Sequence, residues 1–293
     1  MLLVIINSLQ IERRCEIGYY ARDNEPNYML KEFTNYSEAI KGAIFPNMEL
    51  RFVNWYLQHG CDLDCSYCKV PKQKVGIMSQ EDRQEVIQKV RNLCSKQPII
   101  SLLGGEPTLR PDFLVEAVED AANAGFLVNV VSNGWGLTPE LIMRLGKAGL
   151  HYLGISVDSD RNTLKSNLGK ALSLHATTRK FGILPVINTV VTSDTRSEDF
   201  KKFAGEVIRA GCFISPLACS PEVPGGAFSS AQQDLVPSQQ QLRAIIPWLA
   251  WKKLTTGLIT SDFNYLWTLY NSGASSDEVN LWHCASHFRL ERY

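Results

Sequence analysis

The sequence lacks any long run of apolar residues and any excess of charge of one sign. No stretch of about eighteen apolar residues occurs in it, so no membrane-spanning helix is expected. Thirty Lys and Arg residues balance thirty Asp and Glu residues, which gives no reason to expect a nucleic acid or an acidic membrane surface as a partner. A composition of 45% hydrophobic and 20% charged residues argues against disorder and for a globular chain with a full core.

The apolar opening segment, MLLVIIN at residues 1–7, is not expected to be a signal peptide or a membrane span. It has no basic residues and reaches a polar residue at Asn7, so it is too short for either. We interpret it as an edge strand. Without a leader, a reducing cytoplasm is the expected compartment, where a tight cluster among the eight cysteines is expected to bind metal or do redox chemistry rather than form disulfides.

From about residue 51, short apolar runs alternate with amphipathic stretches, a pattern typical of successive βα units. Strands are predicted at residues 50–57, 98–103, 127–132, 152–157, 184–192 and 212–218. Helices are predicted between them at residues 79–94, 111–124, 139–148, 163–181 and 197–210. Right-handed crossovers then give a parallel sheet, either doubly wound or curled toward a barrel, and both forms place ligands at the carboxyl ends of the strands.

The chain divides by its pattern into three parts. Residues 1–48 lack the βα rhythm and are predicted to form a short appendage, and residues 49–220 carry the six βα strands. Residues 221–293 hold most of a Pro-, Gly- and Ser-rich loop, which begins at residue 219 and ends at residue 237, and a helical tail. The loop is interpreted either as a cover over the site or as a mobile linker. Three tryptophans of the tail are predicted to be packing residues: Trp248, Trp251 and Trp267.

Three cysteines, Cys61, Cys65 and Cys68, lie within eight positions after the first βα strand. A structural zinc site would need a fourth ligand, and His59 would have to fold back over one residue to provide it. Buried free thiols are a second alternative, although the flanking charged residues make this a poor core pattern. An iron–sulfur cluster is the third, since clusters are held by closely spaced thiolates. Cys94 lies at an apolar helix spacing and is predicted to be a core residue, so one iron of a four-iron cluster would have no protein ligand.

Other unusual residues also follow the predicted strands, at the edge where ligands bind. The run Gly104-Gly105-Glu106-Pro107 follows the second strand, and its glycines would let a ligand approach the backbone. Pro107 biases Glu106 toward an extended conformation, from which its carboxylate can face an ammonium group. Ser132 and Asn133 end the third strand with polar side chains suited to a carboxylate or a ribose hydroxyl, or form an ordinary turn.

Together these motifs make the sequence resemble the radical S-adenosylmethionine (radical SAM) superfamily over about residues 50–220. Its CxxxCxxC motif is matched by Cys61, Cys65 and Cys68, and its GGEP motif by residues 104–107. The resemblance, which is to the peptide- and natural-product-modifying branch, implies a partial (β/α)6 TIM-like barrel with one 4Fe-4S cluster. In that family S-adenosylmethionine chelates the open iron and is cleaved by one electron to a 5′-deoxyadenosyl radical, which abstracts hydrogen from a substrate.

The resemblance also implies cofactor contacts at matching positions. Glu106 would bind the methionine amine, and Tyr67 would pack near the adenine or simply anchor the loop. In YLGISVDS at residues 152–159, Ser156 and Asp158 match the family's ribose motif, although Asp158 would also serve as a helix cap. Asn188 on the fifth strand would lie near the cofactor if its strand register places it inward. The remaining implied contacts are Gly104, Gly105, Ser132 and Asn133.

The C-terminal region matches the family least. Relatives that act on peptides often carry auxiliary clusters there, but this region has only Cys284, so a single cluster is expected. Cys219, in the loop after the sixth strand, is interpreted as a bystander rather than a thiol facing the substrate. The expected partners are a peptide or small-molecule substrate and an electron donor such as flavodoxin or ferredoxin. The alternative function is a non-catalytic iron–sulfur or zinc-binding module.

Overall fold

The computed structural model describes residues 52–68, 78–93, 97–158, 167–219 and 233–274, together with the backbone of residues 3–5. Several predictions concern segments that lie outside these residues. They are the N-terminal appendage other than residues 3–5, most of the loop at 219–237, and the residues Cys94 and Cys284.

In the described part of the chain, seven strands form one sheet whose spatial order is their sequence order, β1 to β7. The strands are β1 (Leu3–Ile5), β2 (Phe52–Gln58), β3 (Ile99–Gly104), β4 (Leu127–Ser132), β5 (Leu150–Ser156), β6 (Leu184–Val191) and β7 (Phe213–Ala218). β1 pairs antiparallel with β2, and β2 to β7 are all parallel to their neighbours. The predicted edge strand at the N-terminus is confirmed as β1.

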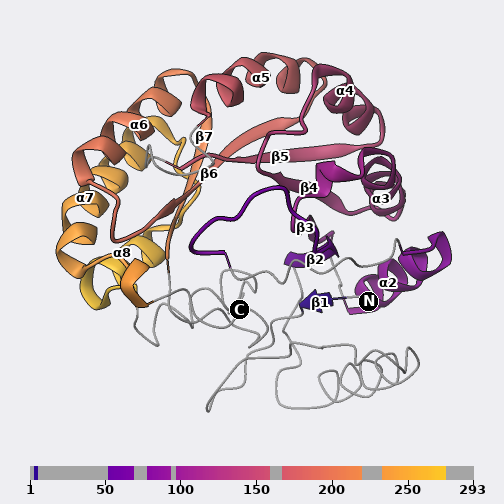
Figure 1. The fold of residues 1–293 in the computed structure, drawn as a ribbon, viewed down its shortest axis with the longest axis horizontal. Helices are drawn as coiled ribbons and strands as arrows, with labels where there is room; N and C mark the ends of the chain where they lie inside the picture. The colour runs from indigo at the N-terminus through magenta and orange to yellow at the C-terminus, as the bar shows by residue number, and fades with distance from the viewer. Residues whose placement is uncertain are drawn as a thin grey trace, which may run out of the picture.

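The helices between the parallel strands lie on one face of the sheet. They are α2 (Gln80–Leu93), α3 (Pro111–Asn123), α4 (Pro139–Lys147), α5 (Leu168–Lys180) and α6 (Ser197–Arg209), followed by α7 (Gln239–Thr256) and α8 (Phe263–Ser272). Crossovers of one hand between strands in sequential order put every connecting helix on the same side. Figure 1 shows α3 to α7 as an outer arc around the strands. This arrangement rules out a doubly wound sheet and confirms the predicted partial (β/α)6 barrel with a helical C-terminal part.

The main core lies between the strands and this layer of helices. Apolar side chains at alternate strand positions, such as Trp55, Leu102 and Val130, are fully buried under the helices. The opposite face of the sheet is more polar. Asn54, Ser101 and Asn129 are neighbours across three strands, and Asn129 Nδ2 donates a hydrogen bond of 2.6 Å to Ser101 Oγ.

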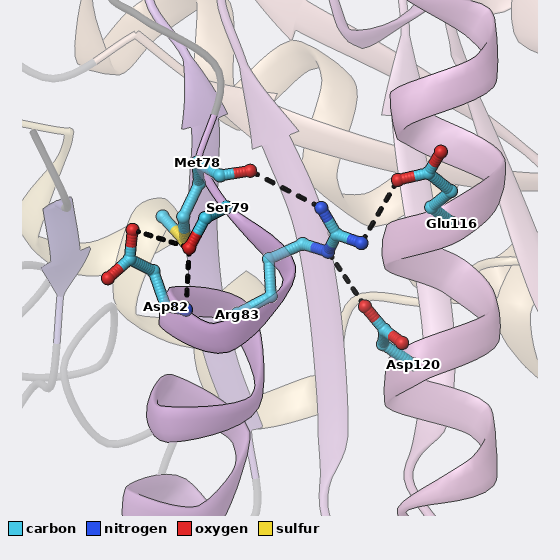
Figure 2. A network of polar contacts seen from close by, with 6 residues as sticks. All are labelled: Met78, Ser79, Asp82, Arg83, Glu116 and Asp120. Carbon is cyan, nitrogen blue, oxygen red and sulfur yellow. Dashed lines mark hydrogen bonds and ion pairs between the residues drawn. The ribbon is translucent and has the colours of Figure 1, made fainter.

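A buried arginine fixes α2, the helix that follows the cysteine segment, against α3. The Arg83 guanidinium contacts Asp120 Oδ2 at 2.7 Å and Glu116 Oε2 at 3.0 Å, and donates to the Met78 carbonyl (Figure 2). It also lies over the ring of Phe113, 5.4 Å from the centroid. Because Arg83 is only 3% exposed, these contacts compensate for burying its charge.

Both edges of the six parallel strands, β2 and β7, are partly covered in the described structure. β1 lies along the outer edge of β2. At the other end, Ile214 N donates to the Leu258 carbonyl at 2.9 Å and Thr260 N donates to the Ile214 carbonyl at 3.0 Å. The segment between α7 and α8 therefore pairs briefly with β7.

The described elements from β2 to β7 begin and end within about two residues of the predicted bounds, with one exception. α5 begins at Leu168 rather than at residue 163, because the Asn167 side chain caps it by accepting a hydrogen bond from Lys170 N. The prediction that the tail tryptophans are packing residues holds for Trp248, which is partly buried against the core. It is wrong for Trp251 and Trp267, which are 62% and 67% exposed.

Among the helices of these ranges, none combines the length and the apolar character needed to cross a membrane.

Candidate functional site

The three clustered cysteines lie in the loop that follows β2, at the carboxyl end of the sheet. Cys61 and Cys65 are half-buried, and Cys68 is exposed. Cys68 N donates to the Cys65 carbonyl at 2.9 Å, which closes a turn, and Leu63 N donates to Cys61 Sγ at 3.4 Å. The exposure of Cys68 does not fit the alternative of three buried core thiols.

The donor set of this loop fits a cluster better than one shared ion. Burial raises the pKa of the Cys61 thiol, a hydrogen bond from Leu63 N opposes the rise, and the negative charges of Asp62 and Glu106 add to it. A cationic cluster would reverse that effect by stabilising the thiolate. Within the described residues, no three His, Cys, Asp or Glu side chains are close enough to share a single metal ion. Thiolates that each bind a different iron of a cluster do not need to meet at one point.

The glycine pair after β3 packs directly against the beginning of the cysteine loop. Gly105 N donates to the Gln58 carbonyl at 2.8 Å, and Glu106 N donates to the Gly60 carbonyl at 2.7 Å. A Cβ atom on Gly104 would lie 2.1 Å from the Gln58 oxygen, and one on Gly105 would lie 2.0 Å from the Gly60 oxygen. Close approach of the protein's own backbone is thus one reason for these glycines, and close approach of a ligand stays a prediction.

Glu106 is held in a fixed, buried position by hydrogen bonds to both carboxylate oxygens. Its backbone is extended, with φ −129° and ψ 108°, as the following proline predicted. Oε1 accepts from Thr108 N at 3.0 Å, Thr108 Oγ1 at 2.6 Å and Ser132 Oγ at 2.8 Å, and Oε2 accepts from Asn133 N at 2.7 Å. The residue is 1% exposed, and the ion pairs of the described residues do not include it. It is a buried carboxylate that a ligand cation would complement.

Ser132 and Asn133, at the end of β4, bind protein groups rather than standing free. Besides donating to Glu106, the buried Ser132 hydroxyl accepts from Gly134 N at 3.0 Å. The Asn133 side chain donates to Asp62 Oδ1 at 2.7 Å and accepts from Trp135 N at 2.9 Å. These two residues therefore connect Glu106 to the cysteine loop.

Tyr67 and Asp158, which the sequence pointed to separately, form a direct pair. The Tyr67 hydroxyl donates to Asp158 Oδ2 at 2.5 Å, and Asp158 Oδ1 accepts from Val190 N at 3.0 Å. Burial, together with the adjacent Asp158 charge, raises the pKa of Tyr67 well above its ordinary range, so the hydroxyl keeps its proton.

Ser156 and Asn188 are neighbours across β5 and β6, on the face of the sheet away from the helices. A Cβ atom on Gly154 would lie 2.4 Å from Asn188 Nδ2, so the asparagine side chain extends over that glycine. The strand register therefore does place Asn188 on the inward face, beside Ser156.

A pocket next to this site contains residues that sequence analysis missed. It is lined in part by Asn133, Ser156, Trp135, Asn167 and Lys170. Lys170 Nζ donates to the Trp135 carbonyl at 2.7 Å and lies over its ring. Trp135 lies two residues after Asn133, and this closeness to the polar pair was the available signal. Lys170 comes from α5, and no feature of the sequence pointed to it.

Comparison with known proteins identifies the family. Residues 55–204 match the model of the Radical SAM superfamily. The chain is 33% identical to an AdoMet-dependent heme synthase of Methanosarcina barkeri (strain Fusaro / DSM 804) over 111 residues, which are 37% of this chain and 31% of that protein. It is 29% identical to a PqqA peptide cyclase of Ruegeria pomeroyi over 196 residues, which are 64% of this chain and 51% of that protein.

Solved structures agree with the fold. SuiB of Streptococcus suis, bound to its precursor peptide SuiA, superposes with a TM-score of 0.60 at 16% sequence identity. The match covers 86% of this chain and 58% of that one. The chain thus spans between about a third and three fifths of the length of these three proteins.

Proposed function

The chain belongs to the radical SAM superfamily, and we propose that it is a radical enzyme with one 4Fe-4S cluster held by Cys61, Cys65 and Cys68. When bound, the reduced cluster and S-adenosylmethionine supply a 5′-deoxyadenosyl radical that takes a hydrogen atom from a substrate. The protein's own part is to hold these groups in place and to exclude competing reactions.

The observation that carries the proposal is the Glu106 carboxylate, buried and rigidly held beside the cysteine loop. A carboxylate with four hydrogen bonds and no described ion pair is a good partner for the ammonium group of S-adenosylmethionine. Gly105 and Glu106 are bonded to residues 58 and 60, just before the cysteines. This bonding links the ammonium-binding group to the cluster loop, as a cofactor that contacts both would require.

The remaining predicted contacts form the rest of the proposed cofactor site. Ser156 and Asn188 lie side by side on the inward face and are proposed to contact the cofactor, Ser156 at the ribose. For Gly104, Gly105, Ser132 and Asn133 the observed bonds favour an indirect part, in which they position Glu106 and the cysteine loop. Tyr67 and Asp158 stay predicted cofactor neighbours, although their polar atoms bond to each other.

We propose a peptide as the substrate class and residues 49–220 as the catalytic core. Support comes from the likeness to a PqqA peptide cyclase and to SuiB bound to a precursor peptide. Residues 1–48 are proposed as an appendage, and residues 221–293 as the region that contributes to substrate selection. A one-electron donor such as flavodoxin or ferredoxin is the proposed reductant.

Anaerobic reconstitution tests this function. The full chain is loaded with iron and sulfide, reduced with dithionite and supplied with S-adenosylmethionine, and 5′-deoxyadenosine is measured. Cys65→Ala is expected to abolish the product, whereas Cys219→Ala, which removes a thiol outside the loop, is expected to leave it unchanged. A correctly loaded protein that forms no deoxyadenosine would reject the proposal in favour of a non-catalytic metal module. Deuterium transfer from labelled peptides into deoxyadenosine tests the substrate class.

A further inference from the structure

The cysteine loop is connected to the barrel by different contacts along its two halves. The half that contains Cys61 is bonded through Gly60 to Glu106 N and through Asp62 to the side chain of Asn133. The half that contains Cys65 and Cys68 includes Tyr67, whose hydroxyl reaches Asp158, 91 residues later in the chain.

Asp158 is well suited to hold a loop because it is itself fixed. It is 5% exposed, and each carboxylate oxygen has a separate partner: Val190 N on β6 for Oδ1 and the Tyr67 hydroxyl for Oδ2. At 2.5 Å the contact with Tyr67 has the length of a charge-assisted hydrogen bond, which is about twice as strong as a neutral one.

We propose that Tyr67 and Asp158 are positioning residues, and that their hydrogen bond holds the Cys65 half of the loop against β5 and β6 before any cluster is bound. The relevance of this tether to catalysis rests on the proposed function. Its consequence is that the thiols are already arranged when iron arrives, so less conformational entropy is lost on cluster binding. The polar atoms of Tyr67 and Asp158 thus serve the loop rather than the nucleotide.

The size of the expected effect follows from the charged acceptor. Removing a hydrogen bond to a charged group increases the population of the opened loop by about tenfold or more. Cys65, which is half-buried and two residues from Tyr67, should report that opening. Cys61, which is held by the other contacts, should report it much less.

The test compares alkylation rates of individual cysteines in the metal-free full chain, with each site followed by mass spectrometry. Tyr67→Phe removes only the hydroxyl and is expected to speed alkylation of Cys65 by about tenfold, with a smaller change at Cys61. Tyr265→Phe is the matched control. The buried Tyr265 hydroxyl accepts a hydrogen bond from Ala218 N on β7, at the other edge of the sheet from β2, so removing it should leave both alkylation rates unchanged. If Tyr67→Phe does not fold, as judged by circular dichroism, Asp158→Asn takes its place with the same expected result.

A second measurement uses the reconstituted protein. Iron loss to a chelator should be several-fold faster in Tyr67→Phe than in wild type and unchanged in Tyr265→Phe. Alkylation needs neither the cluster nor S-adenosylmethionine, so equal Cys65 rates in wild type and Tyr67→Phe overturn the tether whether or not deoxyadenosine forms. An equal increase at Cys61 and Cys65 also overturns it, because it would indicate general loosening.

Discussion

Replacing Glu106 by glutamine tests the central carboxylate with almost no change in shape. The amide has one oxygen, which is best placed where Oε1 accepts its three hydrogen bonds. The NH2 group then faces Asn133 N, so two donors meet where Oε2 accepted a hydrogen bond of 2.7 Å. The variant thus leaves a buried N–H without a partner whichever way the amide is turned.

The magnitude follows from these contacts and from the burial of Glu106, which is 1% exposed. A buried unsatisfied donor costs about 1 to 3 kcal/mol, and removing a buried charge recovers part of this cost, so a net loss of about 1 to 2 kcal/mol in the free energy of unfolding is expected. Loss of the ammonium partner should also weaken S-adenosylmethionine binding to the reconstituted protein by about tenfold or more.

Urea unfolding of the metal-free chain measures the first effect, and equilibrium binding of S-adenosylmethionine measures the second. Glu140→Gln is the matched control, because Glu140 is exposed in the first turn of α4 and its replacement should change both quantities little. If Glu106→Gln were as stable as wild type and bound the cofactor equally well, the carboxylate would not be the ammonium-binding group.

Two further predictions concern stability. Gly105→Ala should destabilise the protein in urea unfolding by about 1 to 3 kcal/mol, because the added Cβ would meet the Gly60 oxygen. Gly169→Ala is the control: Gly169 has open space around it in α5, so this change should stabilise the protein by up to about 1 kcal/mol. The reverse order of stabilities would contradict the packing of the glycine pair. Burial raises the pKa of Cys219 from its ordinary value of 9.0 to about 11, so the folded protein favours the neutral thiol. The contribution of the neutral Cys219 thiol to stability is fully present below pH 9.0 and should be lost as the pH rises toward about 11. The urea midpoint should therefore fall less between pH about 8 and about 10.5 in Cys219→Ala than in wild type, and equal slopes would argue against the raised pKa.

The sequence predicted the strands and the approximate location of the site, because both depend on local patterns. Alternation and caps marked the βα units, and parallel strands of one sheet bring their carboxyl ends to a common edge. The residues at the ends of β2, β3, β4 and β5 could therefore be assigned to one region from the sequence alone. The inward placement of Asn188 required the strand register, which the structure provided.

The partners of each side chain could not be predicted, because they lie far away along the chain. Nothing in the sequence near Tyr67 indicates that Asp158 accepts its hydrogen bond, and nothing near Glu106 indicates that Ser132 donates to its carboxylate. The prediction for Trp251 was wrong for another reason: α7 also carries apolar residues on its outer side, so its pattern does not reveal which face packs. Trp251 consequently lies on the outside, while Ile245 and Leu249 are buried.

The covered edges of the sheet allow this barrel to remain incomplete. A strand edge left bare in solution is a template for pairing with another protein molecule, and complete barrels avoid that hazard by closing. Here β1 lies along β2, and the segment around Leu258 bonds to β7 at Ile214. Deleting either cover, while keeping the rest of the chain, should therefore increase self-association through β-strand pairing.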